Sequence, residues 1–333
     1  MNSEAATLAK PSIAAGGFLD GYCIEAVVAH SRFSTVLRCI ESGTGRTVAV
    51  KVLHDEAEND PILLGRFYRE REIGAKLDHP GLVKVIGLNP AATQPYTVME
   101  WVDGSSLRDI LERQPRLPIR RAMRIAFGVC EVLEYIHSNG IVHRDLKPEN
   151  IMVDAEDRIK LIDFGIADQT DDRRLTFGDL AEIMGTPEYI SPEQLHGRSA
   201  DARSDLYSFG VILYEMLTGQ LPFSGSNAFA LMNERLIRRP EPPCDFVPGI
   251  SQALQAAMFR ALEPDPRKRY QTARTLALDL ADCDRTDGSV GKDPWGGSRL
   301  NMFLLCTMLP LIPVFLFLLL LAAEITWMRQ GRS

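Results

Sequence analysis

The sequence predicts an α+β protein in which strands come first, helices follow, and an apolar helix near the end has the length of a membrane span. Three observations support this prediction. The segment from Tyr22 to Leu53 has the short apolar alternation of a hairpin-rich sheet. Longer segments with helical periodicity follow it, including residues 61 to 78 and Pro118 to His137. Residues 302 to 323 form an apolar run without a charged side chain.

Length and composition limit the protein classes to consider. A chain of 333 residues forms one large domain of two lobes, or two domains with accessory segments. The net charge of -7, without a run of clustered Lys and Arg, argues against a nucleic-acid partner. The six cysteines lack C-x-x-C or disulfide-like spacing, which favours a reducing compartment and no structural zinc. Residues 1 to 20 do not resemble a signal peptide and are expected to form a flexible tail.

A lysine interrupts the most apolar of the predicted strands. Residues 48 to 53 read VAVKVL, so both faces of this strand are apolar except at Lys51. Removing an ammonium group from water is costly unless an anion accompanies it. We therefore expect a carboxylate or a phosphate beside Lys51, although a surface lysine on an edge strand is the other interpretation.

The predicted helix over residues 61 to 78 supplies a partner for this lysine. Asn59 or Asp60 would cap the helix, and Pro61 suits its first turn. Glu70 falls in the middle of the apolar face of this helix, which is formed by Leu63, Phe67, Ile73 and Leu77. A carboxylate on a buried face indicates an ion pair between Glu70 and Lys51, unless the side chain reaches water.

The stretch from His143 to Asn150, HRDLKPEN, concentrates polar chemistry between two apolar segments. Charged side chains, a proline that stiffens the turn and a terminal amide fall within eight residues, as in a catalytic loop. A polar surface loop is the alternative. Two short apolar segments, Ile151–Val153 and 160–162, then read as a hairpin that ends in Asp163-Phe164-Gly165.

These motifs resemble those of the protein kinase family over about residues 21 to 283. The resemblance implies a bilobal fold. Its small N-lobe, residues 21 to 102, would hold an antiparallel sheet with one helix, and its C-lobe, residues 103 to 284, would be mainly helical. A linker at residues 285 to 299, a transmembrane helix at 300 to 323 and a short tail at 324 to 333 complete the predicted organisation.

The resemblance also implies roles for individual residues. Asp145 would orient a substrate hydroxyl and accept its proton, with Lys147 beside it, and Asn150 and Asp163 would hold Mg²⁺ or Mn²⁺. Lys51, paired with Glu70, would bind the α and β phosphates of ATP. The remaining cofactor contacts would come from side chains that enclose the adenine and from the linker backbone, at Val28, Val36, Ala49, Met99, Glu100, Val102 and Met152.

Further matches concern specificity, regulation and support. Residues 185 to 189, GTPEY, resemble the Ser/Thr-specific branch together with Lys147. Arg144 would bind a phosphorylated loop residue, with Thr176 as first and Thr170 as second choice, although a solvated loop threonine is the alternative. Four residues would be structural: His143 in the loop, Asp205 against the loop backbone, and Glu193 paired with Arg269. The resemblance implies that the contact of Asp205 and the pair of Glu193 with Arg269 are usually missing from small-molecule kinases such as aminoglycoside phosphotransferases.

The resemblance fails where the family places a glycine-rich loop over the phosphates. Ala29, Ser31 and Ser34 stand at the three glycine positions of the stretch AHSRFSTV, residues 29 to 36. Losing a glycine from a strained turn costs on the order of 1 kcal/mol, far less than losing the metal ligands. We therefore expect weaker ATP binding with the chemistry retained; an inactive pseudokinase scaffold at the membrane is the alternative.

The predicted function is that of a membrane-anchored serine/threonine protein kinase that phosphorylates proteins, itself included. The helix over 300 to 323 would enter the bilayer with a kink at Pro310 and Pro313. The basic residues that flank it are balanced, so they do not orient it. Use of ATP would place the kinase domain on the cytoplasmic face of the cell membrane. The predicted partners are ATP, protein substrates and the lipid bilayer, with a homodimer as a further possibility.

Overall fold

The computed structural model describes residues 13–87, 94–163, 187–225 and 227–285. These residues belong to the first of two compact units, residues 1–291; the second unit comprises residues 292–333. The predicted transmembrane helix at 300 to 323 lies outside the described residues. Within the described ranges, no helix is at once long enough and apolar enough to cross a membrane.

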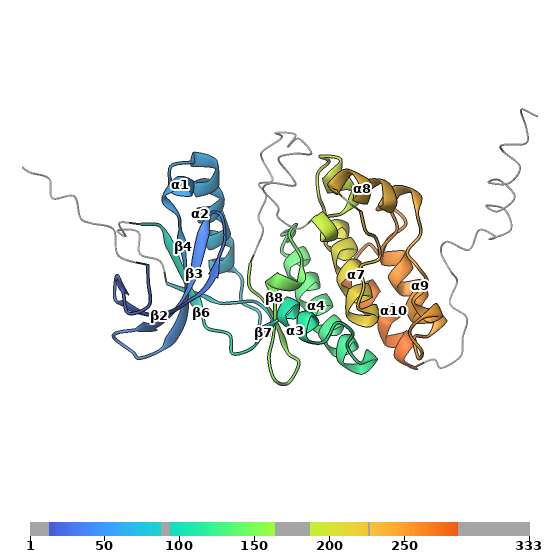
Figure 1. The fold of residues 1–333 in the computed structure, drawn as a ribbon, viewed down its shortest axis with the longest axis horizontal. Helices are drawn as coiled ribbons and strands as arrows, with labels where there is room; N and C mark the ends of the chain where they lie inside the picture. Colours follow the sequence, from blue (N-terminus) through green and yellow to red (C-terminus); the bar gives the residue numbers. More distant parts are fainter. Residues whose placement is uncertain (1–12, 88–93, 164–186, 226, 286–333) are drawn as a thin grey trace, which may run out of the picture. The chain divides into compact units, whose positions relative to one another are not determined.

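A six-stranded antiparallel sheet dominates the N-terminal part of the described unit (Figure 1). Its strands, in spatial order, are β1 (Phe18–Leu19), β2 (Tyr22–His30), β3 (Ser34–Glu41), β4 (Thr47–Leu53), β6 (Tyr96–Glu100) and β5 (Val85–Gly87). One face carries the core of this part, and Leu37, Val48, Val50 and Val98 on it are at most 1% exposed. The predicted hairpin-rich sheet over Tyr22 to Leu53 is confirmed.

The predicted tail at residues 1 to 20 is wrong for its last residues. Phe18 pairs with Cys23, and Leu19 pairs with Tyr22, to form the edge strand β1. Leu19 is only 1% exposed and belongs to the core of the sheet. A strand of two residues is too short for a periodicity signal, so its apolar residues acquire a role only when the neighbouring strand is present.

Two helices follow β4. The short α1 (Asp55–Glu58) precedes α2 (Pro61–Lys76), which packs near β5. The Asp60 side chain accepts hydrogen bonds from the backbone N–H groups of Ile62 and Leu63, at 2.8 and 3.3 Å. The predicted cap and the proline in the first turn are therefore present, and α2 ends two residues before the predicted boundary.

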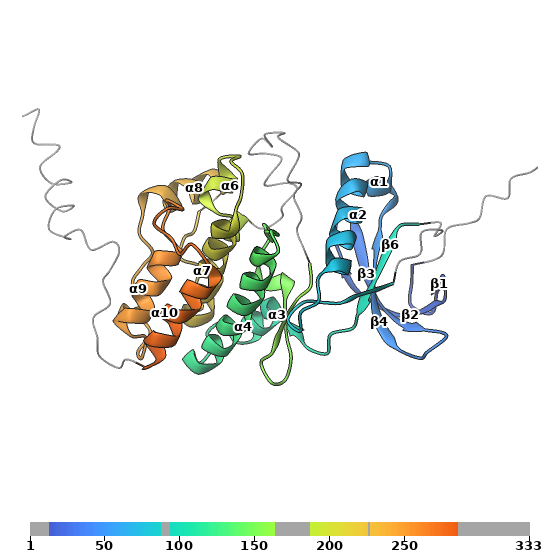
Figure 2. The same ribbon diagram turned by 180° about the vertical axis from the view of Figure 1, so that it is seen from behind.

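Helices form the C-terminal part of the described unit (Figures 1 and 2). They are α3 (Leu107–Arg113), α4 (Ile119–Ser138), α6 (Pro192–Leu195), α7 (Ala202–Thr218), α8 (Ala228–Ile237), α9 (Gln252–Ala261) and α10 (Ala273–Arg285), with short 3-10 turns at Pro148–Asn150, Pro187–Tyr189 and Pro243–Asp245. Every residue of α7 from Ser204 to Thr218 is buried, because α4 and α9 pack against it. Asp205 lies in the first turn of this buried helix.

A second small sheet lies between the first sheet and the helices and carries the predicted catalytic loop. It consists of β7 (Ser105–Ser106), β8 (Ile151–Val153) and β9 (Ile159–Leu161). A bridge between Leu82 and Leu161 and an ion pair of 2.6 Å between Lys160 and Glu100 join it to the N-terminal part. The backbone at Gly104 passes close to that of Val153. A Cβ at Gly104 would lie 2.5 Å from the Val153 carbonyl oxygen, so only glycine fits here.

Candidate active site

A buried carboxylate holds the first half of the loop from His143 to Asn150. The Asp205 side chain, 1% exposed, accepts hydrogen bonds from the backbone N–H groups of His143 and Arg144, both at 2.8 Å. His137 Nε2 lies 2.8 Å from the same carboxylate. Arg144 has a φ of 66°, a left-handed conformation that a side chain disfavours and that these bonds maintain. The predicted contact of Asp205 with the loop backbone is confirmed.

The second half of the loop brings together the residues with predicted catalytic roles. Lys147 Nζ lies 2.7 Å from Asp145 Oδ2. The Asn150 side-chain amide donates to the Asp145 carbonyl oxygen at 2.8 Å and lies 3.3 Å from Asp145 Oδ2. Because the Asn150 nitrogen is used in this way, its side-chain oxygen is left as a ligand for a hard cation.

Lys51 joins the two halves of the unit through two carboxylates. Its ammonium group lies 2.9 Å from Glu70 Oε1 on α2 and 2.6 Å from Asp163 Oδ1, which follows β9. The ion pair predicted from the helical periodicity is therefore present. Burial disfavours the ammonium, but the Asp163 carboxylate beside it raises the pKa of Lys51 above its ordinary value, so the lysine remains charged, as phosphate binding requires.

The electrostatics of this trio differ between the two acids. Burial raises the pKa of Glu70 to about 8, against the opposing attraction of Lys51. Burial also disfavours the Asp163 carboxylate, but the Lys51 ammonium outweighs it and lowers the pKa of Asp163 to about 2. Asp163 is therefore ionised at neutral pH, the state in which a carboxylate binds a divalent cation.

One face of the six-stranded sheet carries the side chains with predicted nucleotide contacts. Val36 pairs with Lys51, and Ala49 pairs with Met99, so these four side chains share the face opposite to the buried core. Val28 is 52% exposed and lies at an irregularity of β2 between paired residues 27 and 29. Met152 lies in β8 and is partly buried.

The connection between the two parts offers backbone groups. Glu100 ends β6, and its N–H already donates to the Lys84 carbonyl at 2.9 Å. The backbone N–H and C=O of Val102 make no hydrogen bond among the described residues. Free backbone groups in a connecting segment suit the recognition of a planar heterocycle.

The turn between β2 and β3 shows how the chain covers this face without glycine. Ser31 Oγ accepts from the N–H groups of Ser34 at 3.0 Å and of Phe33 at 3.4 Å, and it donates to the Ser34 carbonyl at 2.9 Å. Residues 29 to 34 all have negative φ, so the turn does not require glycine. The serine hydroxyl occupies amides that a glycine-rich loop would present to phosphates.

A chain of polar contacts at the base of this turn was not expected. His30 Nδ1 and His54 Nε2 lie 2.9 and 2.8 Å from the hydroxyl of buried Thr35. His54 Nδ1 lies 3.0 Å from the Arg32 carbonyl oxygen, which only accepts, so the proton of His54 is on Nδ1. Thr35 therefore donates to His54 and accepts from His30.

Buried arginines hold the region after residue 187. Arg269 forms two parallel bonds to Glu193, at 2.7 and 2.8 Å, which confirms the predicted pair. Arg235 on α8, 1% exposed, donates to the carbonyl oxygens of Pro187 and Ile190 at 2.8 and 2.5 Å. Arg108 on α3 joins Glu149 of the catalytic loop at 2.9 Å.

Several predicted residues lie outside the described ranges. These are Thr170, Thr176, Phe164, Gly165 and the residues from Gly185 to Thr186. The predictions about loop phosphorylation therefore stay predictions. In the described ranges, no group of three or more His, Cys, Asp or Glu side chains forms a metal cluster. The predicted ligands Asn150 and Asp163 are instead one amide and one carboxylate.

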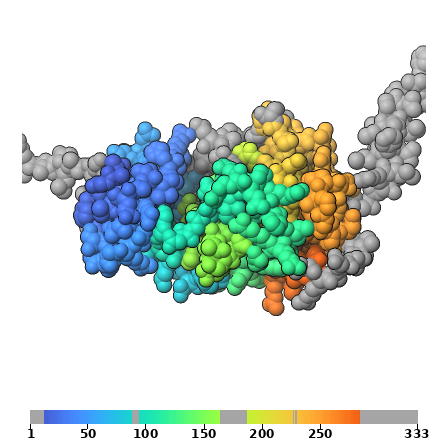
Figure 3. Space-filling view, turned by 60° about the horizontal axis from the view of Figure 1, so that its bottom comes forward, coloured from blue at the N-terminus to red at the C-terminus, as the bar shows by residue number. Residues whose placement is uncertain are grey.

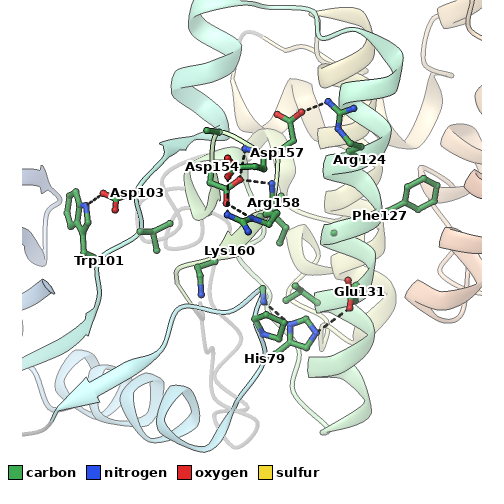
Figure 4. A pocket seen from close by; sticks show the side chains of 18 residues that line it. His79, Trp101, Asp103, Arg124, Phe127, Glu131, Asp154, Asp157, Arg158 and Lys160 are labelled. Carbon is green, nitrogen blue, oxygen red and sulfur yellow. Dashed lines mark hydrogen bonds and ion pairs between the residues drawn. The ribbon is translucent and has the colours of Figure 1, made fainter. Parts of the chain in front are cut away.

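A large cavity lies elsewhere in the unit (Figure 4). It has a volume of about 970 Å³ and is lined by the segment after β6, by α4 and by the turn between β8 and β9. Its charged side chains pair with one another, for example Arg124 with Asp157 at 2.5 Å and Arg158 with Asp154 at 2.7 Å (Figure 4). Of the predicted site residues, only Val102 lines it. The predicted chemistry therefore does not converge on this cavity.

Sequence reasoning missed a set of residues that support the site rather than form it. They are His30, Thr35, His54, Arg108, His137, Gln194 and Arg235. Each one bonds a backbone group or a side chain that lies far away in the sequence or across a turn. None of these residues belongs to a recognisable motif. The only sequence signal for them would have been a polar residue on the apolar face of a predicted helix or strand.

Comparison with known proteins agrees with this geometry. The protein kinase domain family matches residues 24–279. The serine/threonine-protein kinase PknB of Mycobacterium tuberculosis is 42% identical over 239 residues, which cover 71% of this chain and 38% of that protein. The probable serine/threonine-protein kinase SCO3848 of Streptomyces coelicolor is 38% identical over 266 residues, or 79% of this chain and 40% of that protein. The chain thus matches less than half the length of these relatives.

Solved structures show the same fold. The PknI kinase domain of Mycobacterium tuberculosis superposes with a TM-score of 0.63 at 27% identity, covering 82% of this chain and 100% of that one. Rad53 residues 1-466 in complex with AMP-PNP superposes with a TM-score of 0.63 at 32% identity, covering 77% of this chain and 64% of that one. The two-lobed arrangement predicted from the sequence is therefore confirmed, and the chain belongs to the protein kinase family, in its serine/threonine class.

Proposed function

We propose that this chain transfers the γ-phosphoryl group of ATP to serine and threonine hydroxyls of proteins, itself included, while anchored in a membrane. The observation that carries the proposal is the meeting of two groups of side chains. Lys51 contacts Glu70 and Asp163, which come from elements far apart in the sequence, and Asp145 contacts Lys147 and Asn150 within the catalytic loop. The N–H of Ile162, next to Asp163, donates to the Asn150 carbonyl oxygen at 3.1 Å and so brings the two groups together. All six residues match the requirements of phosphoryl transfer.

The residues of this chain would act mainly by position and charge. Asp145 would orient the substrate hydroxyl and accept its proton, and Lys147, 2.7 Å away, would hold the Asp145 carboxylate in place and neutralise charge on the phosphoryl group. Lys51, fixed by Glu70, would bind phosphate oxygens of ATP. The backbone of Glu100 and Val102 would bind the adenine edge, with Val28, Val36, Ala49, Met99 and Met152 around the ring.

The donor set fits a divalent cation of the magnesium or manganese type. Asp163 is ionised because its pKa is lowered, and the Asn150 side-chain oxygen has no competing hydrogen bond among the described residues. When bound, the cation would neutralise charge on the phosphates of ATP. Lys51 Nζ lies 2.6 Å from Asp163 Oδ1, so the lysine that would bind phosphate stands directly beside a carboxylate that would hold the cation.

The membrane part of the proposal rests on sequence alone. A helix over residues 300 to 323 would have about the length of a bilayer's hydrocarbon core, and ATP use would favour a cytoplasmic kinase domain. If the proposal is right, the full chain stays in the membrane fraction at high salt, and removal of residues 300–333 releases it. A chain that salt alone releases would contradict the anchor.

The kinase part is tested by incubating the full chain with labelled ATP, Mg²⁺ and a generic protein substrate. We expect label on Ser and Thr, and a loss of about 10²- to 10⁴-fold in the Asp145→Asn variant. Lys51→Met should lose transfer as well, whereas Lys84→Met, a change at a lysine that is 65% exposed, serves as its matched control. Transfer to aminoglycosides but not to protein would contradict the protein-kinase proposal.

A catalytically inactive scaffold is the second candidate, favoured by the turn at residues 29 to 34. Ser31 occupies amides that phosphates would use, which lowers the expected affinity for ATP. The two candidates differ in one result. A melting temperature that rises with ATP and Mg²⁺, without any label transfer, would support the scaffold. The size of the solubilised chain in solution tests for a homodimer.

A further inference from the structure

The segment between α3 and the first turns of α4 is unusually basic. Residues 113–124 contain five arginines and no acidic residue, in a chain where Asp and Glu outnumber Lys and Arg by 44 to 37. The expectation that the sequence lacks clustered basic residues was therefore wrong here. Prolines and apolar residues separate the arginines, which hides the cluster from a search for a continuous basic run.

The structure divides these arginines into two groups. Arg121 and Arg124 both pair with Asp157, at 2.7 and 2.5 Å. The other three are exposed and make no ion pair among the described residues; they are Arg113, Arg116 and Arg120, and together we call them the arginine patch. Arg113 donates only to the Asp109 carbonyl oxygen. Three exposed cations without a carboxylate partner repel one another unless an anion lies near them.

The position of the patch relates it to the end of the described unit. Helix α10 packs along α4, and the N–H of Arg274 in its first turn donates to Glu134 near the C-terminal end of α4. The last turn of α10 therefore lies toward the first turn of α4, as Figures 1 and 2 show. Figure 3 brings this side forward and shows the surface of α3 and α4 (teal) open beside that of α9 and α10 (orange to red). Arg285, the last described residue, therefore lies toward the end of α4 at which Arg120 stands.

We propose that the arginine patch binds anionic lipid head groups and holds the kinase unit against the membrane surface; this inference rests on the membrane anchor proposed above. Residues 286–299 separate α10 from the proposed membrane helix. Fourteen residues would span about 20 Å if they behaved as a Gly/Ser-type linker, so the patch would stay near the lipid surface. Attraction between basic side chains and anionic lipids acts within about 10 Å of that surface.

The charge balance favours a lipid over a nucleic acid as the partner. The whole chain has a net charge of -7, which opposes approach to a polyanion in solution. An anchored unit is already at the membrane surface. Three cations therefore need only favour the orientation in which the arginine patch faces the lipid. Each basic residue near an anionic surface contributes about fivefold to binding, so three contribute about 100-fold to the docking equilibrium.

The test uses the full chain in nanodiscs of neutral phosphatidylcholine and in nanodiscs with about a third phosphatidylglycerol. Hydrogen–deuterium exchange of the peptide that contains residues 113–120 reports docking. We expect slower exchange in the anionic discs at low salt, and no difference between the discs at 0.5 M salt. The triple variant Arg113→Gln/Arg116→Gln/Arg120→Gln should lose the difference.

The matched control removes the same number of exposed positive charges elsewhere. Its three changes, Arg46→Gln, Lys76→Gln and Arg198→Gln, leave the patch intact, and we expect it to behave like the wild type. Equal exchange in both discs would overturn the proposal, and so would an equal effect of the control variant. Melting temperature and kinase activity in detergent check that both variants fold.

The same preparations distinguish failure of the arginine patch from failure of the proposed membrane anchor or of the proposed kinase activity. A chain that inserts into both discs without a lipid-dependent difference keeps the anchor and overturns the patch. A chain that does not insert, but floats with anionic vesicles at low salt and loses this in the triple variant, keeps the patch and contradicts the anchor. Failure of phosphoryl transfer affects neither result.

Discussion

The catalytic loop and the turn over the phosphates belong to one proposed site but are held in different ways. The backbone of the catalytic loop bonds to Asp205, a carboxylate that is 1% exposed on the buried helix α7. The turn at residues 29 to 34 is held by the exposed Ser31 and by contacts to His54. Hydrogen bonds on a surface compete with water, whereas buried ones do not. We therefore expect the catalytic loop to be the more rigid of the two, and the turn at residues 29 to 34 to change its conformation more easily.

This difference explains which family residues the chain retains. In the proposed function, Asp145, Asn150 and Asp163 would supply charges and ligands that other side chains replace poorly. The glycines of a phosphate loop supply only space and conformational freedom. Serine restores the turn by another route, because its hydroxyl bonds the backbone and keeps φ negative.

The largest effect is expected when the buried anchor of the catalytic loop is altered. Asp205→Asn replaces one acceptor oxygen by a donor that faces a backbone N–H, which leaves buried groups unsatisfied. We expect the free energy of unfolding to fall by about 2–4 kcal/mol and phosphoryl transfer to fall about 100-fold. Denaturant unfolding and label transfer measure the two quantities.

Asp201→Asn is the control for this change. Asp201 caps the same helix, and its side chain is 50% exposed. Asparagine also caps helices, so this variant should stay within about 0.5 kcal/mol of the wild type. A similar loss in both variants would mean that the burial of Asp205 does not distinguish the two sites.

A smaller effect is expected at the base of the phosphate-covering turn. Thr35→Val keeps the shape of the side chain but removes the hydroxyl that links His30 to His54. We expect the KM for ATP to rise about fivefold with little change in kcat, since one hydrogen bond contributes about 1 kcal/mol. Thr35→Ser keeps the hydroxyl and should restore the wild-type KM. Equal KM values for both variants would show that the shape of the side chain, not its hydroxyl, matters.

Returning a glycine to the turn should act in the opposite direction. Ser31→Gly frees the N–H groups of Phe33 and Ser34 to meet phosphate oxygens. We expect the KM for ATP to fall about two- to fivefold, less than the effect at Thr35 because added freedom of the turn offsets part of the gain. Ser31→Ala also releases these N–H groups but adds less backbone freedom than glycine. Comparing the two variants shows whether the released N–H groups or the backbone freedom has the larger effect on the KM. An increase in KM in both variants would contradict the competition between Ser31 and phosphate.

A further prediction is a pH dependence of stability at Glu70. Its pKa of about 8 in the folded state lies above the ordinary value near 4.3, so the folded chain holds a proton that the unfolded chain releases. The stability contribution of Glu70 should therefore fall as pH rises from about 4 to about 8. Asp163, with a pKa of about 2, contributes no change in this window.

Glu70→Gln tests this because glutamine resembles the protonated acid. We expect the melting temperature of the variant, relative to the wild type, to increase between pH 5 and pH 8.5. A constant difference across this range, measured without nucleotide or metal, would mean that Glu70 is ionised throughout and that Lys51 outweighs its burial.

The elements with strong local signals were predictable from the sequence. The periodicity of residues 61 to 78 placed Glu70 on the buried face of α2, and the buried strand left Lys51 in need of an anion. The positions of Asp145, Asn150 and Asp163 followed from motifs with fixed spacing. The strand β1 escaped prediction because two residues carry no periodicity.

The supporting residues could not be predicted because their partners are distant. Arg235 reaches the carbonyl oxygens of residues 187 and 190, and Arg108 reaches Glu149, only after α8 and α3 have packed. The arginine patch was equally hidden. Its three members differ from Arg121 and Arg124 only in the absence of a carboxylate, and Asp157 comes from a turn more than thirty residues away.

The sequence by itself determined the fold class, the charged groups available for catalysis and the apolar run near the end, because these depend on residue type, spacing and periodicity. The tertiary structure decided which of those groups meet. It brought Lys51 between two carboxylates, placed Asp205 under the catalytic loop and replaced the missing glycines by a serine turn. Burial and pairing depend on contacts between distant segments, and these form only when the chain has folded.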